Sequence, residues 1–164
     1  MGKKKNKKTN IYLMLGIMLS FFIFQINCKN KPVQTNTETV YFLVAEMVHY
    51  HGDSYILPLT NPADIATADK IINGTSPAKI VMADIDYGTE KGEYKNKDLV
   101  NPSKRKWSWH VSKFRGFAST VTSNLNSWPT YVEEHLNQWM KNTGGKIGFA
   151  TYTISRRVAI SEMK

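Results

Sequence analysis

The stretch NPADIATADKIINGTSPAKIVMADIDYG, residues 61–88, holds the two clearest secondary-structure patterns of the 164-residue chain. Its first half predicts a helix, because Asn61 can cap the first turn, Pro62 fits within that turn, and Gly74 can end it. The apolar face of this helix consists of Ile65, Ala68 and Ile72.

The second half of the stretch predicts a strand, because apolar and acidic residues alternate along it. One side of the strand carries Val81, Ala83, Ile85 and Tyr87, and the other carries Asp84 and Asp86. The two aspartates should therefore face solvent while the apolar side packs on a core.

Toward the N-terminus, VYFLVAEMV (40–48) and YILPLT (55–60) are separated by HYHGDS (49–54). Two apolar runs around a Gly-Asp cluster predict a β-hairpin. His49, His51 and Asp53 in this turn could ligate a transition metal, since a His-x-His pair can place two imidazoles on one face. We favour ordinary polar turn residues and predict no metal and no cofactor.

Toward the C-terminus, the sequence predicts a polar exposed loop, two strands, a helix and one or two closing strands. These segments are 89–106, 107–112, 114–124, 127–142 and 146–160. In the helix, Thr130 and Glu133 have the spacing of a capping box. Its buried stripe should contain Val132, Leu136, Trp139 and Met140.

Short connections between most strands favour antiparallel pairing. The sequence therefore predicts an α+β fold: a single domain with a mainly antiparallel sheet and two helices packed on one face. DIDYGTEKGE could suggest calcium through Asp84, Asp86, Glu90 and Glu93, but Gly88 stands where an EF-hand needs an oxygen ligand.

The N-terminal segment has the zones of a secretory signal: five lysines within residues 3–8, then an apolar run from Ile11 to Phe24. The run is shorter than a typical membrane span. It ends four residues before Cys28, the only cysteine, and this arrangement resembles the signal of bacterial lipoproteins. Gln25 and Asn27 depart from the usual residues before that cysteine.

We expect Cys28 to be acylated, which would make the protein an exported, membrane-anchored lipoprotein of the cell envelope. An uncleaved membrane anchor and simple secretion are the alternatives. The predicted organisation is a signal peptide at 1–27, a flexible tether at 28–38 and a globular domain at 39–164.

The basic excess of the chain lies largely in the signal. The chain has 22 basic and 13 acidic residues, and residues 1–27 hold five lysines and no acid, so 17 and 13 remain and the net charge falls from +9 to +4. A nucleic-acid partner is not expected, because it would need a dense basic face and an intracellular location.

NPSKRKWSWH, residues 101–110, is the most suggestive surface stretch. If the aromatic residues are exposed, it could bind an anionic envelope polymer, lipid headgroups or a protein partner. In the other interpretation, both tryptophans are in the core and only the basic run is solvated. The candidate residues are Lys104, Arg105, Lys106, Trp107, Trp109 and His110. We expect His110 and His135 to be structural.

Four segments together resemble a family of small exported domains labelled calmodulin-binding-like proteins. They are LTNPADIATADKIINGT, WSWH, YVEEHL and SRRV, and the resemblance covers Tyr55 to Val158. Many members carry two cysteines that this chain lacks, so their disulfide is not expected here. The resemblance implies no activity that can be transferred.

The sequence thus supports two functions. The first is an envelope lipoprotein with a small binding or structural domain, and the second is a small exported enzyme using metal or carboxylate chemistry. We favour the first, because the sequence has no nucleophile motif of the Gly-x-Ser-x-Gly type and no cysteine after Cys28 for thiol chemistry.

Overall fold

A computed structural model describes residues 38–48, 50–92 and 94–164, which belong to one compact unit, Thr37–Lys164. Its longer strands are β1 (Val40–Glu46), β2 (Ser54–Leu59), β3 (Ile80–Tyr87), β6 (Trp109–Ala118) and β8 (Tyr152–Val158). The short ones are β4 (Glu90–Lys91), β5 (Tyr94–Lys95) and β7 (Lys146–Ile147). The helices are α2 (Pro62–Ile72), the 3-10 turn η2 (Ser123–Leu125), α3 (Pro129–Glu134), α4 (Leu136–Thr143) and α5 (Ile160–Met163).

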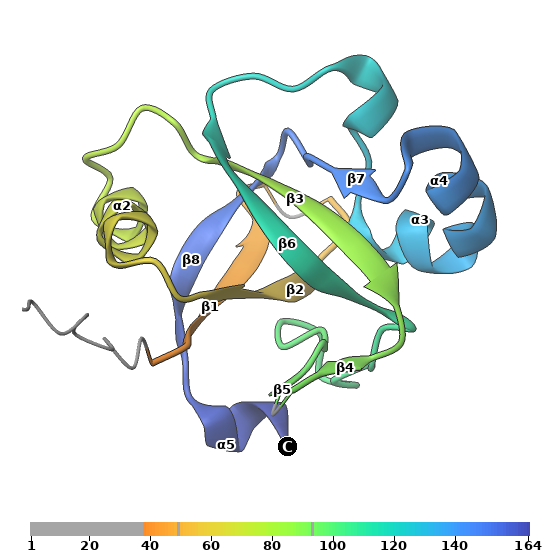
Figure 1. The fold of residues 1–164 in the computed structure, drawn as a ribbon, viewed down its shortest axis with the longest axis horizontal. Coiled ribbons are helices and arrows are strands. Elements are labelled where there is room, and N and C mark those ends of the chain that lie inside the picture. Colours follow the sequence, from red (N-terminus) through yellow and green to blue (C-terminus); the bar gives the residue numbers. More distant parts are fainter. Residues whose placement is uncertain (1–37, 49, 93) are drawn as a thin grey trace, which may run out of the picture. The chain divides into compact units, whose positions relative to one another are not determined.

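The strands form two three-stranded antiparallel sheets, in the orders β2-β1-β8 and β6-β3-β7, and a small β4-β5 hairpin. The predicted first hairpin is confirmed, with Val40 opposite Leu59 and Ala45 opposite Ser54. The two sheets meet along their long strands, because β2 lies beside β6 and β3 lies beside β8 (Figure 1).

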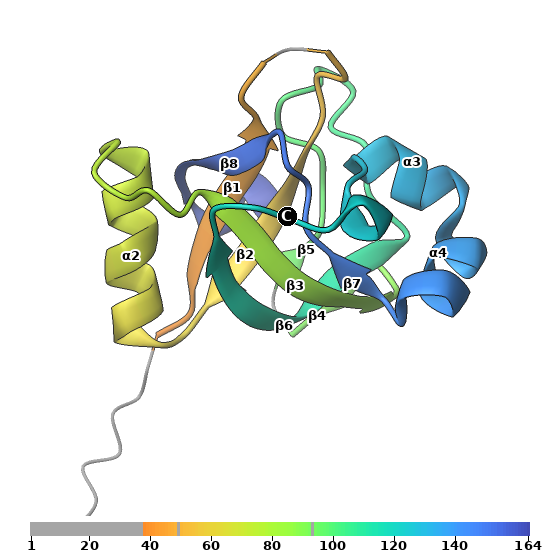
Figure 2. The same cartoon turned by 90° about the horizontal axis from the view of Figure 1, so that it is seen from above.

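The predicted helix at residues 61–75 is confirmed as α2. The Asn61 side chain accepts a hydrogen bond from Ala63 N at 2.8 Å, and Gly74 follows the last turn with a φ of 71°. An ion pair between Arg157 of β8 and Asp69, with an N···O distance of 2.6 Å, fixes α2 beside the first sheet. Helices α3 and α4 lie at the opposite end of the domain (Figure 2).

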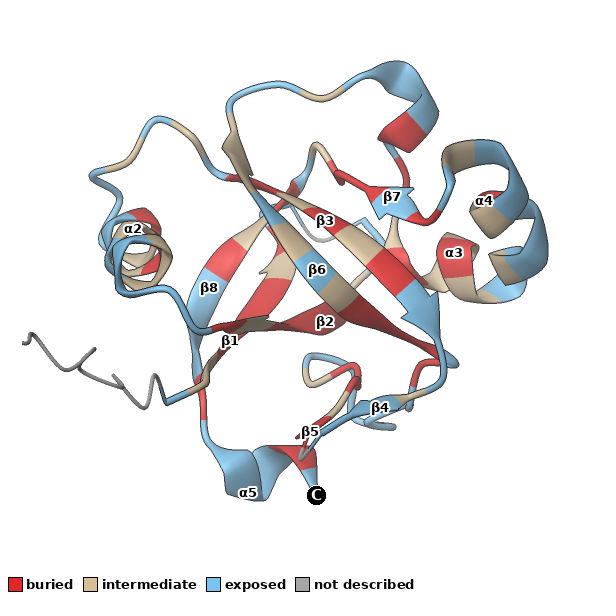
Figure 3. Cartoon of the chain, in the orientation of Figure 1, coloured by how far each residue is buried: buried red, intermediate tan, exposed pale blue. Residues whose placement is uncertain are grey.

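The main core lies between the two sheets (Figure 3) and is rich in aromatic residues. Its largest fully buried side chains include Trp107, Trp109, Tyr55, Tyr152 and Phe149. A smaller cluster outside the first sheet joins Tyr41, Ile56 and Tyr94 to Met163 of α5. The α+β class and the antiparallel pairing are confirmed, with four α-helices in the described residues where two were expected.

The prediction of an exposed loop at 89–106 is wrong. Within it, β4 and β5 form a hairpin, and Tyr94, Asn96 and Asp98 are at most 2% exposed. The Asn96 amide joins the facing edges of the two sheets: its Oδ1 accepts from Ile56 N and its Nδ2 donates to Trp109 O, each at 2.9 Å. The Asn96 side chain therefore links β2 to β6 with one accepted and one donated hydrogen bond, as the backbone of an intervening strand would.

The two strands expected at 107–112 and 114–124 are one strand, β6. Its pairing with β3 skips Ser112 and Arg115, which identifies two β-bulges. Both bulged side chains reach Asp84: Ser112 Oγ donates to its backbone oxygen at 3.2 Å, and Arg115 Nε donates to its carboxylate at 2.9 Å. The two bulges thus allow one continuous strand, although the alternation of inward and outward side chains changes register at each bulge.

The predicted helix at 127–142 is divided at His135 into α3 and α4, and the capping box is wrong. Trp128 is the N-cap residue of α3, and Thr130 lies inside the helix. Thr130 Oγ1 donates to Asp53, and Glu133 accepts from the backbone and hydroxyl of Ser108. No helix within the described residues has the length and apolarity that a membrane crossing requires.

Candidate functional site

The predicted basic stretch Lys104, Arg105 and Lys106 is exposed and held in a defined conformation. Lys106 pairs with Lys97 in an isolated antiparallel bridge, and Asp98 N donates to Arg105 O at 2.8 Å. These contacts anchor the stretch to the segment that follows β5.

The same bridge gathers further cations that the sequence analysis did not select. Lys97 is 6% exposed, and its Nζ donates to the backbone oxygen of Lys164. Burial lowers the pKa of Lys97, and the charges of Lys106, Lys95 and Lys104 lower it further. We call Lys95, Lys97, Lys104, Arg105 and Lys106 the basic surface.

Two acidic residues act on the basic surface: Glu90 forms an ion pair with it, and Glu162, the ion-pair partner of Arg156, interacts electrostatically with Lys104. Glu90 of β4 pairs with Lys95 at 3.1 Å between Oε1 and Nζ. Among the described residues, Lys104, Arg105 and Lys106 have no ion pair within 4.0 Å. Their charges are therefore available to an anionic ligand.

Lys104 occupies a backbone conformation that favours glycine, with a φ of 46°. Its N–H donates to Asn101 O at 2.9 Å, and Ser103 N donates to Asn101 Oδ1 at 3.0 Å. Lys104 is the only non-glycine residue of the described segments with a positive φ. A lysine therefore occupies this turn position although its side chain makes the positive φ unfavourable.

Trp107 and Trp109 do not form an exposed platform, because they are 1% and 0% exposed. Trp107 Nε1 donates to Ser54 O at 2.8 Å, and the Arg105 guanidinium lies 5.3 Å from the centre of the Trp107 ring. The second interpretation of this stretch, with both tryptophans in the core, is the one that the structure supports. His110 is also buried, and its Nδ1 donates to Gly88 O at 2.9 Å.

The candidate metal ligands of the first turn serve different contacts. His49 lies outside the described residues. The His51 ring stacks on Trp128 at 4.1 Å, while the Asp53 carboxylate accepts from Thr130 N at 2.9 Å, from Thr130 Oγ1 at 2.7 Å and from the Tyr152 hydroxyl. Asp53 therefore already has three donors and is 3% exposed.

The acidic residues of the candidate calcium site also make separate contacts. Asp84 pairs with Arg115, Asp86 accepts from Tyr87 N at 2.8 Å, and Glu90 pairs with Lys95. Glu93 lies outside the described residues. Within the part of the chain that the structure describes, no three His, Cys, Asp or Glu residues are placed to hold a metal ion.

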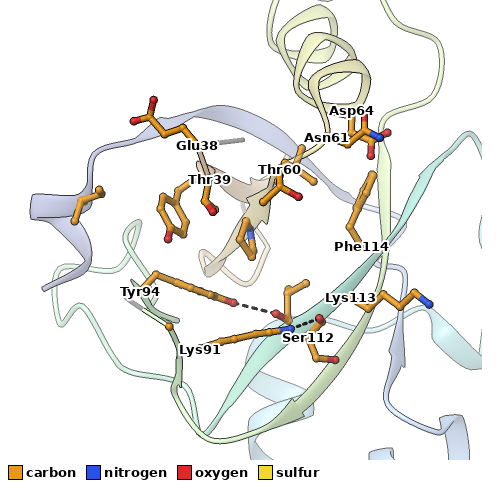
Figure 4. Close-up of a pocket in the computed structure, with 16 residues that line it drawn as sticks. Glu38, Thr39, Thr60, Asn61, Asp64, Lys91, Tyr94, Ser112, Lys113 and Phe114 are labelled. Carbon is orange, nitrogen blue, oxygen red and sulfur yellow. Dashed lines mark hydrogen bonds between the residues drawn. The ribbon is translucent and has the colours of Figure 1, made fainter. Parts of the chain in front are cut away.

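A groove of about 720 Å³ lies between the edges of β2 and β6 (Figure 4), and Tyr94, one of its lining residues, directly precedes Lys95 of the basic surface in the chain. Tyr94 and Lys91 extend along one wall to the backbone oxygens of Val111 and Ser112 (Figure 4). Apolar side chains alternate there with hydroxyls and with charges of both signs. The lining includes Glu38, Thr39, Tyr41, Pro58, Thr60, Asp64, Lys113, Phe114 and Ile160.

The outer edge of β2 is closed where it approaches the groove. Ser54 O accepts from Trp107, Ile56 N donates to Asn96, and Pro58 has no N–H to offer. An extended peptide could therefore not pair with β2 as an added strand. A ligand in the groove would therefore be held mainly by side chains.

Three tyrosines have pKa values well above the ordinary range, and all three belong to the core. Burial is the main cause for Tyr55, Tyr94 and Tyr152, and the hydrogen bond to Asp53 adds to it for Tyr152. Each hydroxyl therefore stays protonated and acts as a packed or hydrogen-bonded group.

Comparison with known proteins places this arrangement in a family. The model of the BP-74 N-terminal domain matches residues 38–161, which include every described strand and both ends of the groove. No curated protein and no solved structure matches the chain. On the match over residues 38–161, the chain belongs to the BP-74 N-terminal domain family.

Proposed function

We propose that this protein is an exported bacterial lipoprotein, anchored through acylated Cys28, whose domain binds an anionic polymer of the cell envelope. The basic surface is the observation that carries the ligand choice. Five basic residues lie close together there: Lys104, Arg105 and Lys106 are exposed, Lys95 pairs with Glu90, and Lys97 is buried in the fold. An anionic polymer would relieve the mutual repulsion of these charges and gain several contacts at once.

The groove is consistent with this ligand but does not select it, because Glu38 and Asp64 line it together with Lys91 and Lys113. Tyr55 and Tyr152, two of the three tyrosines with strongly raised pKa values, do not line the groove, and Tyr94, which does, is 2% exposed and donates its hydroxyl to Val111 O. This supports binding over acid-base catalysis, since catalytic groups of shifted pKa normally lie in accessible clefts. The likeness to calmodulin-binding-like domains remains a prediction and adds no ligand to this proposal.

The anchor rests on the order of lysines, apolar run and cysteine in residues 1–28. Acyl chains would hold the protein in the membrane, each buried methylene contributing about 0.8 kcal/mol. We expect the membrane-extracted protein to have the intact mass of a chain that begins at Cys28 plus acyl groups. Cys28→Ser should abolish acylation; a full-length mass with an unmodified cysteine would refute the anchor.

The basic surface is tested by binding to alginate, a soluble anionic glycan. The triple variant K104Q/R105Q/K106Q should weaken binding about tenfold, since each lost charge costs about 0.5 kcal/mol in a screened surface contact. The control is K70Q/K79Q/K141Q, which removes three exposed lysines elsewhere. Binding should also fall as salt rises. Equal losses in both variants would mean that net charge, and not this surface, determines binding.

A further inference from the structure

A second hollow of about 380 Å³ is lined by residues of η2, α3 and α4. Helices α3 and α4 lie at the end of the domain opposite α2 (Figure 2). We call this hollow the amide cleft, after the side chains that dominate its polar lining. Its eleven lining residues are Ser123, Asn124, Asn126, Ser127, Trp128, Tyr131, His135, Gln138, Trp139, Asn142 and Thr143.

The amide cleft is free of acidic, lysine and arginine side chains among the described residues that line it. Charged residues make up 21% of the chain, so a lining of this size would ordinarily contain about two. The neighbouring hollow, of about 610 Å³, shares His135 and Gln138 but is lined by Glu133 and Glu134 as well. The acidic side chains of α3 therefore line the neighbouring hollow, and none of them lines the amide cleft.

Aromatic rings form a continuous row along the cleft. Tyr131 stands at the centre, with Trp128 at 5.2 Å, His135 stacked at 4.2 Å and Trp139 edge-on at 6.3 Å between ring centres. His51 stacks on Trp128 at 4.1 Å, and Trp139 Nε1 donates to Lys146 O at 3.1 Å. These contacts fix the rings before any ligand arrives, which lowers the entropy cost of binding.

The division of the helix at His135 sets the polar groups beside this row. His135 Nδ1 lies 3.0 Å from Tyr131 O, and because a carbonyl only accepts, Nδ1 carries the proton. In the neutral ring Nε2 is then left as an acceptor. A side chain that bonds to the preceding turn is a common cause of such helix breaks.

Amide groups around the row have unused hydrogen-bonding capacity. The side chains of Asn124, Gln138 and Asn142 are exposed and have no hydrogen-bond partner in residues 38–48, 50–92 and 94–164. Gln138 and Asn142 are four residues apart on α4 and so share one face. Ser127, which also lines the cleft, is 7% exposed, and its Oγ is without a partner in this part of the chain.

We propose that the amide cleft binds an uncharged saccharide. A sugar ring offers an apolar C–H face that can lie on the fixed aromatic rings, and hydroxyls that both donate and accept. Amide side chains also combine a donor with an acceptor, so they match neighbouring hydroxyl pairs. A charged ligand would leave its charge uncompensated there, which disfavours acidic glycans. This site is independent of the lipid anchor and of the basic surface.

The test is calorimetric titration of the full chain in detergent with three uncharged trisaccharides: triacetylchitotriose, maltotriose and cellotriose. At least one should bind with a Kd below about 10 mM, in the range of shallow saccharide sites. Gln138→Ala should weaken this binding about fivefold through loss of one or two hydrogen bonds. Alanine favours helix, so α4 should remain intact.

The matched control is Asn137→Ala, on the same helix but facing the neighbouring hollow, where Asn137 Oδ1 accepts from Tyr87. It should leave saccharide affinity within about twofold of the parent. Absence of binding by all three trisaccharides would overturn the proposal. So would equal effects of Gln138→Ala and Asn137→Ala, or loss of binding in the K104Q/R105Q/K106Q variant.

Discussion

Asp53 shows how a single turn residue connects three distant parts of the chain. Its carboxylate caps α3 through Thr130 N and Oγ1 and also accepts from the Tyr152 hydroxyl of β8. A carboxylate at a helix N-terminus is stabilised by the unpaired N–H groups of the first turn. The cap that sequence spacing assigned to Thr130 and Glu133 is thus supplied from 77 residues away.

Asp53→Asn should destabilise the domain by about 2–4 kcal/mol, because it weakens hydrogen bonds to a buried charged acceptor. The measurement is urea unfolding followed by tryptophan fluorescence. Glu134→Gln, an exposed acid on α3, serves as the control and should change stability by less than about 0.5 kcal/mol. A similar small effect of Asp53→Asn would show that the three contacts do not stabilise the fold.

At the scale of elements, the segment after β5 takes the place of a strand between the two sheets. Tyr94, Asn96 and Asp98 are buried at every second position, as on one side of a strand, and Lys97 between the last two is buried as well. Tyr94 donates to Val111 O of β6 at 3.1 Å, and Asp98 accepts from Ser54 Oγ of β2 at 2.8 Å. Side chains therefore satisfy edge groups that backbone pairing leaves open.

Asn96→Ala should cost about 2–4 kcal/mol, since it leaves Ile56 N and Trp109 O buried without partners. Asn96→Asp keeps the acceptor for Ile56 N but loses the donor to Trp109 O, so its cost should also be large. Asn137→Ala, at an exposed position, provides the control. Denaturant unfolding measures all three, and equal stabilities of the Asn96→Ala and Asn137→Ala variants would contradict the bridging role.

These elements show which parts of the fold the sequence can predict. Helix α2 and the first hairpin were predictable because their apolar periodicity and end signals are local. The segment 89–106 was not, since its inward positions are Asn and Asp, whose partners lie in β2 and β6. Polar residues buried by distant partners have the same sequence pattern as an exposed loop.

The candidate sites also differ in how far the sequence could predict them. Residues 104–106 could be found from sequence as a basic run, but Lys95 and Lys97 join it only through the bridge between Lys97 and Lys106. The amide cleft has no sequence signal, because it is assembled from η2, α3 and α4 by the break at His135. Neutral polar residues spread over three short elements show no periodicity.

At the scale of the whole molecule, the basic surface and the amide cleft share the core that positions them. Trp107 follows the basic run and donates to Ser54, while Asp53, the neighbour of Ser54 in the chain, caps the helix that carries Tyr131. Ser54 thus supports the basic surface through Trp107, and the adjacent Asp53 supports the amide cleft through α3. Loss of the core packing should release both sites together.

The buried tyrosines predict a cooperative alkaline transition of the whole domain. In the folded state the pKa values of Tyr55, Tyr94 and Tyr152 lie above the ordinary value of 10.0, mainly because of burial. Above about pH 10 the unfolded chain therefore releases protons that the folded chain keeps, and stability falls as pH rises. Each such tyrosine contributes a slope of up to about 1.4 kcal/mol per pH unit.

Lys97 acts in the opposite direction, because burial lowers its folded pKa below the ordinary 10.5. Its contribution to stability increases as pH rises toward that value. This is one titrating group, whereas three tyrosines act in the destabilising direction. We expect tyrosinate absorbance and loss of circular dichroism to rise together above about pH 10, with a shallower dependence in Tyr152→Phe. Gradual titration of all the tyrosines of the domain with the fold intact would show that the three hydroxyls are not held in the core.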